Sequence, residues 1–122
     1  MNQNVSGSLL AQYTAGDALA NTVYTPPSNL RVEITRIVIC NTTAGAGAAS
    51  LFHDDDGTTY NNTTALMFGE NVAANSRLEL FTEGPNGGIH VSKNGTIGFT
   101  DSLAGGLTIS IYGISQIITE RM

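Results

Sequence analysis

Short runs of β-strand composition, broken by clusters of Gly, Asn, Asp and Pro, recur along the whole chain. Turn signals about 8–12 residues apart are typical of β-sandwiches and jelly rolls. No segment has the apolar period of an amphipathic helix of useful length, although Asp17–Ala20 and Glu70–Asn75 are each compatible with a helical turn. The sequence therefore predicts an all-β, single-domain antiparallel β-sandwich with jelly-roll character.

The expected strands are the runs that lie between turn signals. They are Ser8–Tyr13, Asn21–Tyr24, Leu30–Cys40, Ala49–His53, Thr58–Tyr60, Leu66–Phe68, Arg77–Phe81, Gly88–Ser92, Thr96–Thr100 and Leu107–Ile114. We expect residues 15–122 to form the β-sandwich domain. Residues 1–14 precede it, and the sequence leaves open whether they are an N-terminal arm or an edge strand of the same sheet.

One hairpin can be placed in register from its turn. A three-residue loop that ends at Gly95 pairs Val91 with Ile97. The next pair on the same face is then Ile89 with Phe99, which puts all four apolar side chains together. This register requires Gly95 in the left-handed conformation of a type I turn with a G1 bulge.

A second hairpin follows from the same reasoning. A loop that ends at Gly57 pairs His53 with Thr59 and Phe52 with Tyr60. The second pair would be a favourable cross-strand aromatic contact.

The long run from Leu30 to Cys40 changes its apolar phase. Alternate residues are apolar as far as Ile34, and the pattern restarts one position later at Ile37. A phase change of this kind predicts a bulge near Thr35-Arg36 or a strand that passes from one sheet to the other.

Charged side chains are scarce: Asp, Glu, Lys and Arg make up 12% of the chain, against about 25% in a typical soluble domain. Thr, Asn and Gly together account for 40 of the 122 residues. A surface of short neutral side chains loses little side-chain entropy when another subunit covers it, and interface centres are depleted in Lys, Glu and Asp. This composition favours a surface that other protein chains cover; the alternative is an ordinary Asn- and Thr-rich β-protein.

The charge balance argues against a nucleic-acid partner. The net charge is −5, and the five basic residues are scattered: Arg31, Arg36, Arg77, Lys93 and Arg121. Neutralising a phosphate backbone takes clustered Lys and Arg. We expect no direct contact with nucleic acid and no binding to a membrane surface.

Cys40 is the only cysteine, so no intrachain disulfide is possible. It follows the apolar residues 37–39, and we expect a buried, unreactive thiol. The first residues lack the basic segment of a secretion signal, and no apolar run approaches membrane-spanning length. We expect a chain that is made and used without export.

An acidic run, Asp54-Asp55-Asp56-Gly57, suggests calcium at first sight. Calcium loops space their acids at alternate positions, and three consecutive side chains cannot point to one centre if the segment is extended. An Asx-type turn with a solvated tip is the simpler interpretation. We expect no metal; if an ion binds, Asp54 and Asp56 are the candidate ligands, because alternate residues share a side.

No catalytic arrangement can be assembled from the reactive residues. His53 and His90 have no partner nucleophile in an activating context, and Cys40 lies in an apolar strand. The Gly- and Ala-rich segment after Cys40 lacks the helix that a dinucleotide-binding turn needs. We expect no enzymatic activity and no cofactor. We also expect the aromatic side chains, which are spread along the strands, to pack in the core.

A resemblance appears in the middle of the chain. The strand that ends Cys40-Asn41-Thr42 precedes a Gly/Ala loop and then the string His-Asp-Asp-Asp-Gly-Thr-x-Tyr at His53–Tyr60. This series resembles small virion proteins of bacteriophages that have a β-sandwich of this size, over about Thr22–Gly113. The resemblance implies a capsid decoration (cement) protein or a part of a tail or fibre attachment, and it brings no catalytic residues.

The leading hypothesis is a capsid decoration protein that binds the outer capsid surface at capsomer junctions and stabilises the shell. Its expected partners are the major capsid protein and two further copies in a homotrimer, and its expected location is the virion surface after assembly in the host cytoplasm. The alternative is a tail-fibre, tail-tip or receptor-binding-associated module, with the loops at Asp54–Gly57 and Gly84–Gly88 as candidates for contact with a host glycan.

Apolar residues near the two ends are the candidates for contact with other subunits: Leu9, Leu10, Tyr13, Ile117 and Ile118. In an arm they would lie against a neighbour, for instance as a strand added to its sheet. In an edge strand they would pack on the chain's own core. The sequence leaves both readings open.

Overall fold

The computed structural model describes residues 8–14, 19–81, 88–103 and 105–117. Its strands are β1 (Ser8–Thr14), β2 (Asn21–Tyr24), β3 (Leu30–Asn41), β4 (Gly47–Asp54), β5 (Ala65–Val72), β6 (Ser76–Phe81), β7 (Ile89–Val91), β8 (Thr96–Asp101) and β9 (Leu107–Ile117). The described residues contain no helix, and so none that could span a membrane.

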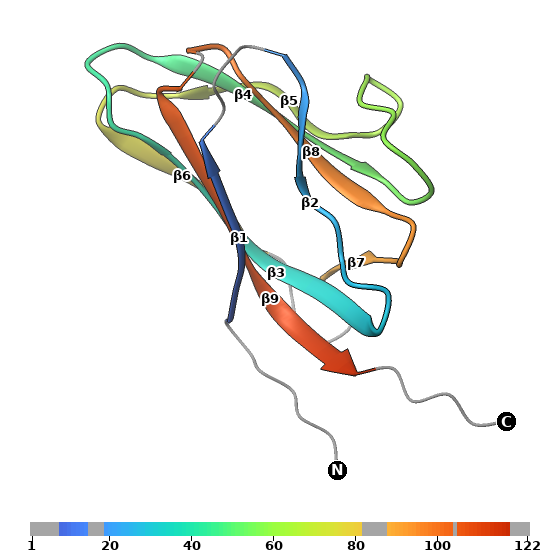
Figure 1. Cartoon of the computed structure of the whole chain (residues 1–122). Coiled ribbons are helices and arrows are strands. Elements are labelled where there is room, and N and C mark those ends of the chain that lie inside the picture. The colour runs from blue at the N-terminus through green and yellow to red at the C-terminus, as the bar shows by residue number, and fades with distance from the viewer. Residues whose placement is uncertain (1–7, 15–18, 82–87, 104, 118–122) are drawn as a thin grey trace, which may run out of the picture.

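The strands form two antiparallel sheets that pack face to face (Figure 1). One has the order β1-β9-β3-β6, with β7 also paired to β3; the other has the order β2-β8-β4-β5. We call them the five-stranded and the four-stranded sheet. The predicted all-β, antiparallel β-sandwich is confirmed, and nine of the ten expected runs form strands.

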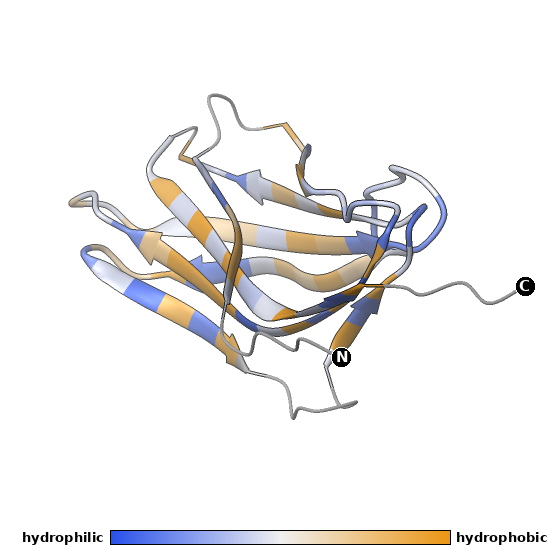
Figure 2. Ribbon diagram, turned by 60° about the horizontal axis from the view of Figure 1, so that its bottom comes forward, coloured by the Kyte–Doolittle hydropathy of each residue, from blue (hydrophilic) through white to orange (hydrophobic). Residues whose placement is uncertain are grey.

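The apolar residues of β3 point into the core on both sides of its phase change. Val32 and Ile34 are fully buried, and so are Ile37 and Ile39. The register between β3 and β9 shifts between Ile34 and Arg36, so the bulge predicted there is confirmed. The extra residue restores the inward direction of the following side chains. Figure 2 shows bands of apolar and polar residues alternating along several of the other strands.

The predicted hairpin around Gly95 is wrong. β7 pairs with β3, placing Val91 opposite Val32, whereas β8 pairs with β2 and β4 in the other sheet. The turn exists, because the Gly95 N–H donates to the Ser92 carbonyl at 2.9 Å, but it connects the two sheets. Gly95 does not have the expected positive φ; among the described glycines only positions 69 and 105 do. β7 therefore pairs with the edge of β3, which is distant in the sequence, and not with β8, which follows it directly.

The second predicted register is also wrong, although its aromatic contact exists. β4 pairs with β5, so that Phe52 lies opposite Ala65, and residues 58–60 are not a strand. The rings of Phe52 and Tyr60 nevertheless lie 5.8 Å apart. The long loop between β4 and β5 folds back and brings Tyr60 to Phe52 without a ladder.

Neither expected helical turn is present in the described residues. β5 runs as far as Val72, and a turn with Asn75 at φ 53° follows, so the helical turn at Glu70–Asn75 is wrong. In the segment Asp17–Ala20, residues 17 and 18 lie outside the described part, and residues 19 and 20 are not helical.

Candidate interaction surfaces

The N-terminal candidates lie on β1, an edge strand of the five-stranded sheet that pairs with β9. Leu10 and Tyr13 pack against the core, whereas Leu9 is 52% exposed opposite Tyr112. Leu9 and Leu10 point different ways because adjacent residues of a strand alternate, and the register shift between Leu9 and Ala11 lets both Leu10 and Ala11 pack on the core. Of these three candidates, Leu9 is the one available to another chain.

The C-terminal candidate Ile117 ends β9, opposite Leu30, and is 65% exposed. Ile118 lies outside the described residues. Leu9 sits opposite Tyr112, five residues before Ile117 on β9, which corresponds to about 17 Å along the strand. The structure therefore places Leu9 and Ile117 on the same sheet but does not bring them into one patch.

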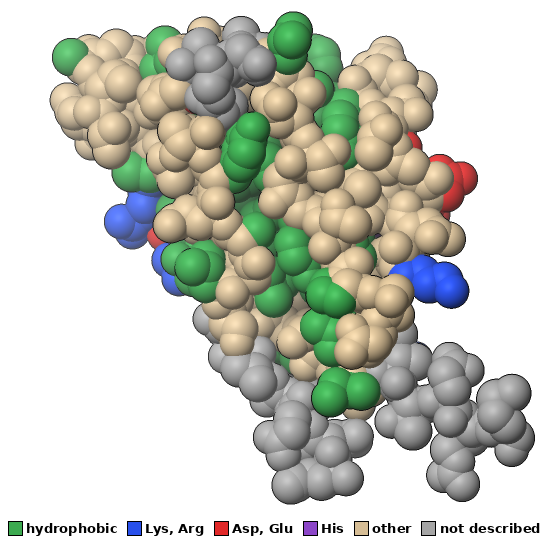
Figure 3. Space-filling view, viewed as in Figure 1, with side chains coloured by type: hydrophobic (Ala, Val, Ile, Leu, Met, Phe, Trp, Pro, Cys, Tyr) green, Lys and Arg blue, Asp and Glu red, His purple; other side chains and the backbone are tan. Residues whose placement is uncertain are grey.

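Charged residues are missing from three strands at this side of the molecule. Neither edge strand β1 or β2, nor β9, contains Asp, Glu, Lys or Arg. Figure 3 shows this face: hydrophobic side chains run down its middle among uncharged polar ones, and charged groups appear only at its margins. Edge strands usually carry charges that prevent pairing with other chains. Here the charges are absent from both edge strands, although β1 has a register shift and β2 is only four residues long, which are other ways in which an edge is protected.

Three aromatic rings form a row across the outer face of the four-stranded sheet. Tyr60 lies over Gly98 of β8: a Cβ added at Gly98 would come within 2.6 Å of the Tyr60 ring. The Phe52 ring lies 5.8 Å from Tyr60 and 6.2 Å, edge-on, from Phe68. The row therefore crosses β8, β4 and β5, and we call it the aromatic row.

The β5 end of the aromatic row is open to solvent. Phe68 is 66% exposed and Leu66 is 44% exposed, so the expectation that every aromatic packs in the core is wrong for Phe68, and Tyr60 and Tyr112 also lie half-buried outside the core. Gly69 adopts a positive φ of 64°, and its N–H donates to Ser50 Oγ at 2.8 Å in an irregular part of the β4–β5 pairing. The sequence signal for this exposed pair is that apolar residues stand on both sides of Met67, so that a strand here has apolar side chains on both of its faces.

The acidic run forms the expected Asx-type turn at the start of the β4–β5 loop. The Asp54 carboxylate accepts the N–H groups of Asp56 at 3.1 Å and Thr59 at 2.7 Å. These backbone donors, Thr59 first, lower the pKa of Asp54. The pKa of Asp56 is raised by its hydrogen bond with Asp54 and by the charges of Asp54 and Asp55.

The premise that three consecutive aspartates cannot point to one centre is wrong for this turn. One carboxylate oxygen from each of Asp54, Asp55 and Asp56 lies within 4.8 Å of the others, because the chain turns here instead of remaining extended. Exposed acids commonly gather in this way without an ion. The assignment of no metal, with Asp54 and Asp56 as the fallback ligands, stays a prediction.

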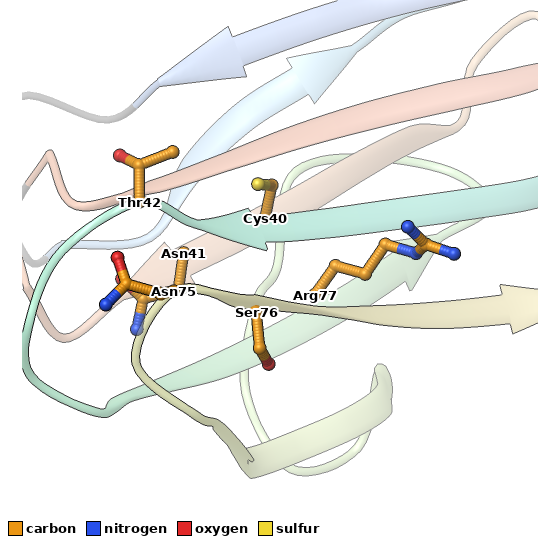
Figure 4. Close-up of a pocket in the computed structure, with 6 residues that line it drawn as sticks. All are labelled: Cys40, Asn41, Thr42, Asn75, Ser76 and Arg77. Atoms are coloured by element: carbon orange, nitrogen blue, oxygen red, sulfur yellow. The ribbon is translucent and has the colours of Figure 1, made fainter.

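Cys40 is not buried as expected: it is partly exposed on the outer face of the five-stranded sheet. Residues 37 and 39 face the core, so the strand alternation itself puts residue 40 outside. Together with its cross-strand neighbour Arg77 and with Thr42, it lines a pocket of about 340 Å³ (Figure 4). Figure 4 shows Cys40 and Thr42 pointing to the same side, with the Arg77 side chain alongside.

Beside this pocket, one carboxylate serves two guanidinium groups. Glu79 Oε2 lies 2.8 Å from Arg77 Nε and 3.1 Å from Arg36 Nη2. The hydrogen bond from Arg36, helped by the charge of Arg77, lowers the pKa of Glu79. Arg36 also lies 5.4 Å from the centre of the Tyr112 ring. The group as a whole keeps one surplus positive charge.

Charge is divided unequally between the sheets. Within the described residues, the four-stranded sheet and its β4–β5 loop contain acids and no Lys or Arg: Asp54, Asp55, Asp56, Glu70 and Asp101. The four described basic residues lie on the five-stranded sheet or in the turn after β7, with two acids beside them: Arg31, Arg36, Arg77 and Lys93, with Glu33 and Glu79.

The histidines show no catalytic arrangement in the described part of the chain. His53 Nε2 is buried and has no hydrogen-bond partner. His90 is exposed and lines a small pocket of about 140 Å³ with Arg31 and Glu33.

The sequence matches no protein-family model and no curated protein. Solved structures share the fold. A chain in the structure of Bacillus endospore appendages, which form disulfide-linked pili, aligns over 98% of this chain and 88% of its own length, with 18% identity and a TM-score of 0.51. A chain in the structure of infectious bursal disease virus strain Gx aligns over all of this chain and 34% of its own, with 12% identity and a TM-score of 0.52.

A chain from the capsid of Helicobacter pylori bacteriophage KHP30 also aligns, over 98% of this chain and 95% of its own, with 12% identity and a TM-score of 0.43, too low to carry an argument. At these identities the likeness shows the fold alone. The first two structures have in common that they are protein assemblies, a pilus and a virus particle.

Proposed function

We propose that this chain is a structural protein of a bacteriophage virion, and specifically a capsid decoration protein. The observation that carries the proposal is the absence of charged residues from β1, β2 and β9, with Leu9 and Ile117 exposed at separate places on β1 and β9. An edge strand without charged side chains is more open to pairing with another chain than a charged one. The same edge is an advantage in a chain that other subunits cover.

The expected partners are the major capsid protein and two further copies of this chain. Closed cyclic symmetry is the rule for homo-oligomers, and a homotrimer suits a local three-fold axis between capsomers. A trimer that binds three neighbouring sites gains about two orders of magnitude or more in avidity without new contacts. It would brace the outside of the shell across capsomer seams. This mechanism needs binding and shape, and no chemistry.

Attachment is expected at the two ends of the chain. Leu9 on the free side of β1 and Ile117 at the end of β9 are the exposed members of the candidate set, and Ile118 follows directly. A neighbour's strand could add to the edge at β1 through main-chain hydrogen bonds. Leu10 and Tyr13 support that edge from inside by packing on the core.

The second candidate is a tail-fibre or tail-tip module. Two observations favour it: the fold is shared with a chain of a filamentous appendage over 88% of that chain, and the aromatic row lies close to the acidic turn at Asp54. Aromatic rings beside polar groups are the elements of a glycan-binding patch. In this role the β4–β5 loop with the aromatic row, and not the uncharged edge, would contact the host glycan.

Labelling the protein in the particle distinguishes the two candidates. A gold-tagged antibody against the folded domain, imaged by electron microscopy on intact virions, should mark the capsid faces in many copies. Label confined to the tail would replace the decoration role with the tail role. Particles without label, although the protein is present in the infected cell, would contradict both.

A further inference from the structure

We propose that two copies of this chain join through a heterologous contact in which Leu66 and Phe68 of one copy bind the pocket beside Cys40 and Arg77 of the next. The contact deepens the homotrimer part of the proposed function and rests on it. The two halves lie on different sheets, so the contact is heterologous: it closes into a ring when the rotation between copies allows and continues as an open array otherwise, and sedimentation of the wild-type protein distinguishes the trimer from a longer assembly.

The first half of the contact is the ledge on β5, defined as Leu66 and Phe68. Both side chains are exposed on an edge strand, and Phe68 leans edge-on against buried Phe52 at 6.2 Å between centroids. The edge-on contact with the Phe52 ring restricts Phe68, so less side-chain freedom is lost on binding than for an isolated exposed side chain. Pre-ordered aromatic side chains of this kind are typical centres of protein interfaces.

The second half is the pocket on the five-stranded sheet. It has a volume of about 340 Å³ and is lined by Cys40, Asn41, Thr42, Asn75, Ser76 and Arg77. By volume the pocket falls within the about 300–1,000 Å³ of small-ligand sites, and the proposal places the Phe68 ring in it. The Arg77 guanidinium beside it provides a cation for the face of an incoming ring.

Charge selects a second copy in this orientation. The exposed charges of the sheet with the ledge and its β4–β5 loop are the acids Asp55, Asp56 and Glu70, with Lys93 in the adjoining turn, and the sheet with the pocket carries the surplus charge of Arg36 and Arg77 over Glu79. Bringing the two different sheets together pairs opposite signs, which steers association. A two-fold contact between two ledges would instead bring two acidic sheets together.

Two variants separate the halves of the contact. Phe68→Ser removes the ledge and leaves the pocket, whereas Thr42→Tyr fills the pocket from an exposed position and leaves the ledge. Each should weaken self-association at least about tenfold, measured by sedimentation, because burying one such aromatic ring is worth that much or more. Leu19→Ser is the matched control, since Leu19 is 69% exposed but belongs to neither half.

The decisive test mixes the two variants. Unlabelled Thr42→Tyr protein, with an intact ledge, is added to ¹⁵N-labelled Phe68→Ser protein, with an intact pocket. We expect amide shifts confined to residues around the pocket, such as Cys40, Ser76 and Arg77. Unlabelled protein carrying both substitutions should give no shifts.

Other outcomes overturn the inference. Absence of shifts in the mixture, or shifts centred on β1, would show that this is not the contact, and so would a wild-type assembly that survives Phe68→Ser. None of these results touches the proposed decoration role, which the location of the protein in the particle tests separately. A correct contact in a protein absent from virions would leave the inference standing and remove the role.

Discussion

The ring of Tyr60 occupies the space toward which a side chain at Gly98 would point: a Cβ there would lie 2.6 Å from the Cδ1 and Cε1 atoms of the ring. The Tyr60 hydroxyl is held at 2.6 Å from Thr22 Oγ1 and at 2.7 Å from Thr96 Oγ1. Tyr60 therefore fastens the long β4–β5 loop across β8 and onto the edge strand β2. The absence of a side chain at position 98 makes this fastening possible.

Gly98→Ala should lower the free energy of unfolding by about 1–3 kcal/mol, because the added methyl group displaces the Tyr60 ring from a packed site. Urea unfolding of Gly98→Ala, Tyr60→Ala and the double variant measures the coupling. The double variant should cost less than the sum of the two single ones, since the clash disappears with the ring. Strict additivity would show that the two residues do not interact in this way.

Asn41→Ala should destabilise the fold by about 2–4 kcal/mol, because the buried amide of Asn41 satisfies several backbone groups at once. Its Nδ2 donates to the carbonyls of Gly45 at 2.8 Å and Val72 at 3.1 Å, and its Oδ1 accepts the N–H of Thr43 at 2.9 Å. Chemical denaturation provides the measurement. Asn62→Ala, at an exposed position, is the matched control and should stay within about 0.5 kcal/mol of wild type. Equal stabilities of the two variants would contradict this role.

The contribution of Glu79 to stability should depend on pH. Arg36, through its hydrogen bond, and Arg77 lower the pKa of Glu79 from its ordinary 4.5. A folded pKa below the unfolded one gives a stabilisation that is complete above the unfolded value and is lost as the pH falls through the folded value. Glu79→Gln should therefore lower Tm at pH 7, and the difference from wild type should shrink as the pH is lowered below 4.5.

Thermal melts of both proteins across this range check the expectation. Glu70→Gln removes an exposed carboxylate outside the arginine pair and serves as the matched control. A Tm difference for Glu79→Gln that stays constant down to low pH would mean that the ion pairs with Arg36 and Arg77 contribute nothing.

Calcium should leave Tm nearly unchanged. Both oxygens of the Asp54 carboxylate already accept backbone N–H groups, from Asp56 and Thr59, and are thus partly used. Calcium loops instead offer six to eight oxygen ligands, spread over about 12 residues. Differential scanning calorimetry with calcium, with magnesium and with a chelator makes the comparison. A large rise in Tm with calcium alone, removed by Asp54→Asn, would assign a metal site to this turn.

The sequence predicts side-chain directions well where they depend only on the alternation of residues within one strand. The apolar phase of β3 predicted its bulge between Ile34 and Arg36 correctly, because inward and outward directions alternate within the strand itself. The same rule places Cys40 outside, since Ile39 faces the core. The expectation of a buried thiol is wrong because the alternation of the strand, and not the apolar character of the residues before Cys40, sets the direction of its side chain.

Pairing between strands was harder to predict. The turn that ends at Gly95 looks like a hairpin turn, but the strands on its two sides belong to different sheets, because β7 completes the free edge of β3. Exposure of Phe68 likewise depends on which strand ends up at an edge and on the irregularity at Gly69. These outcomes depend on partners far away in the chain, which a local pattern does not contain.

The central claim is that other protein chains cover this molecule's neutral surface. The most direct measurement adds purified protein to phage shells assembled without it and counts the bound copies by quantitative sedimentation. We expect saturable binding at a fixed number of copies per capsomer junction, with wild-type protein from solution filling every site. Protein that remains free at all concentrations, on shells in every state of expansion, would contradict the account.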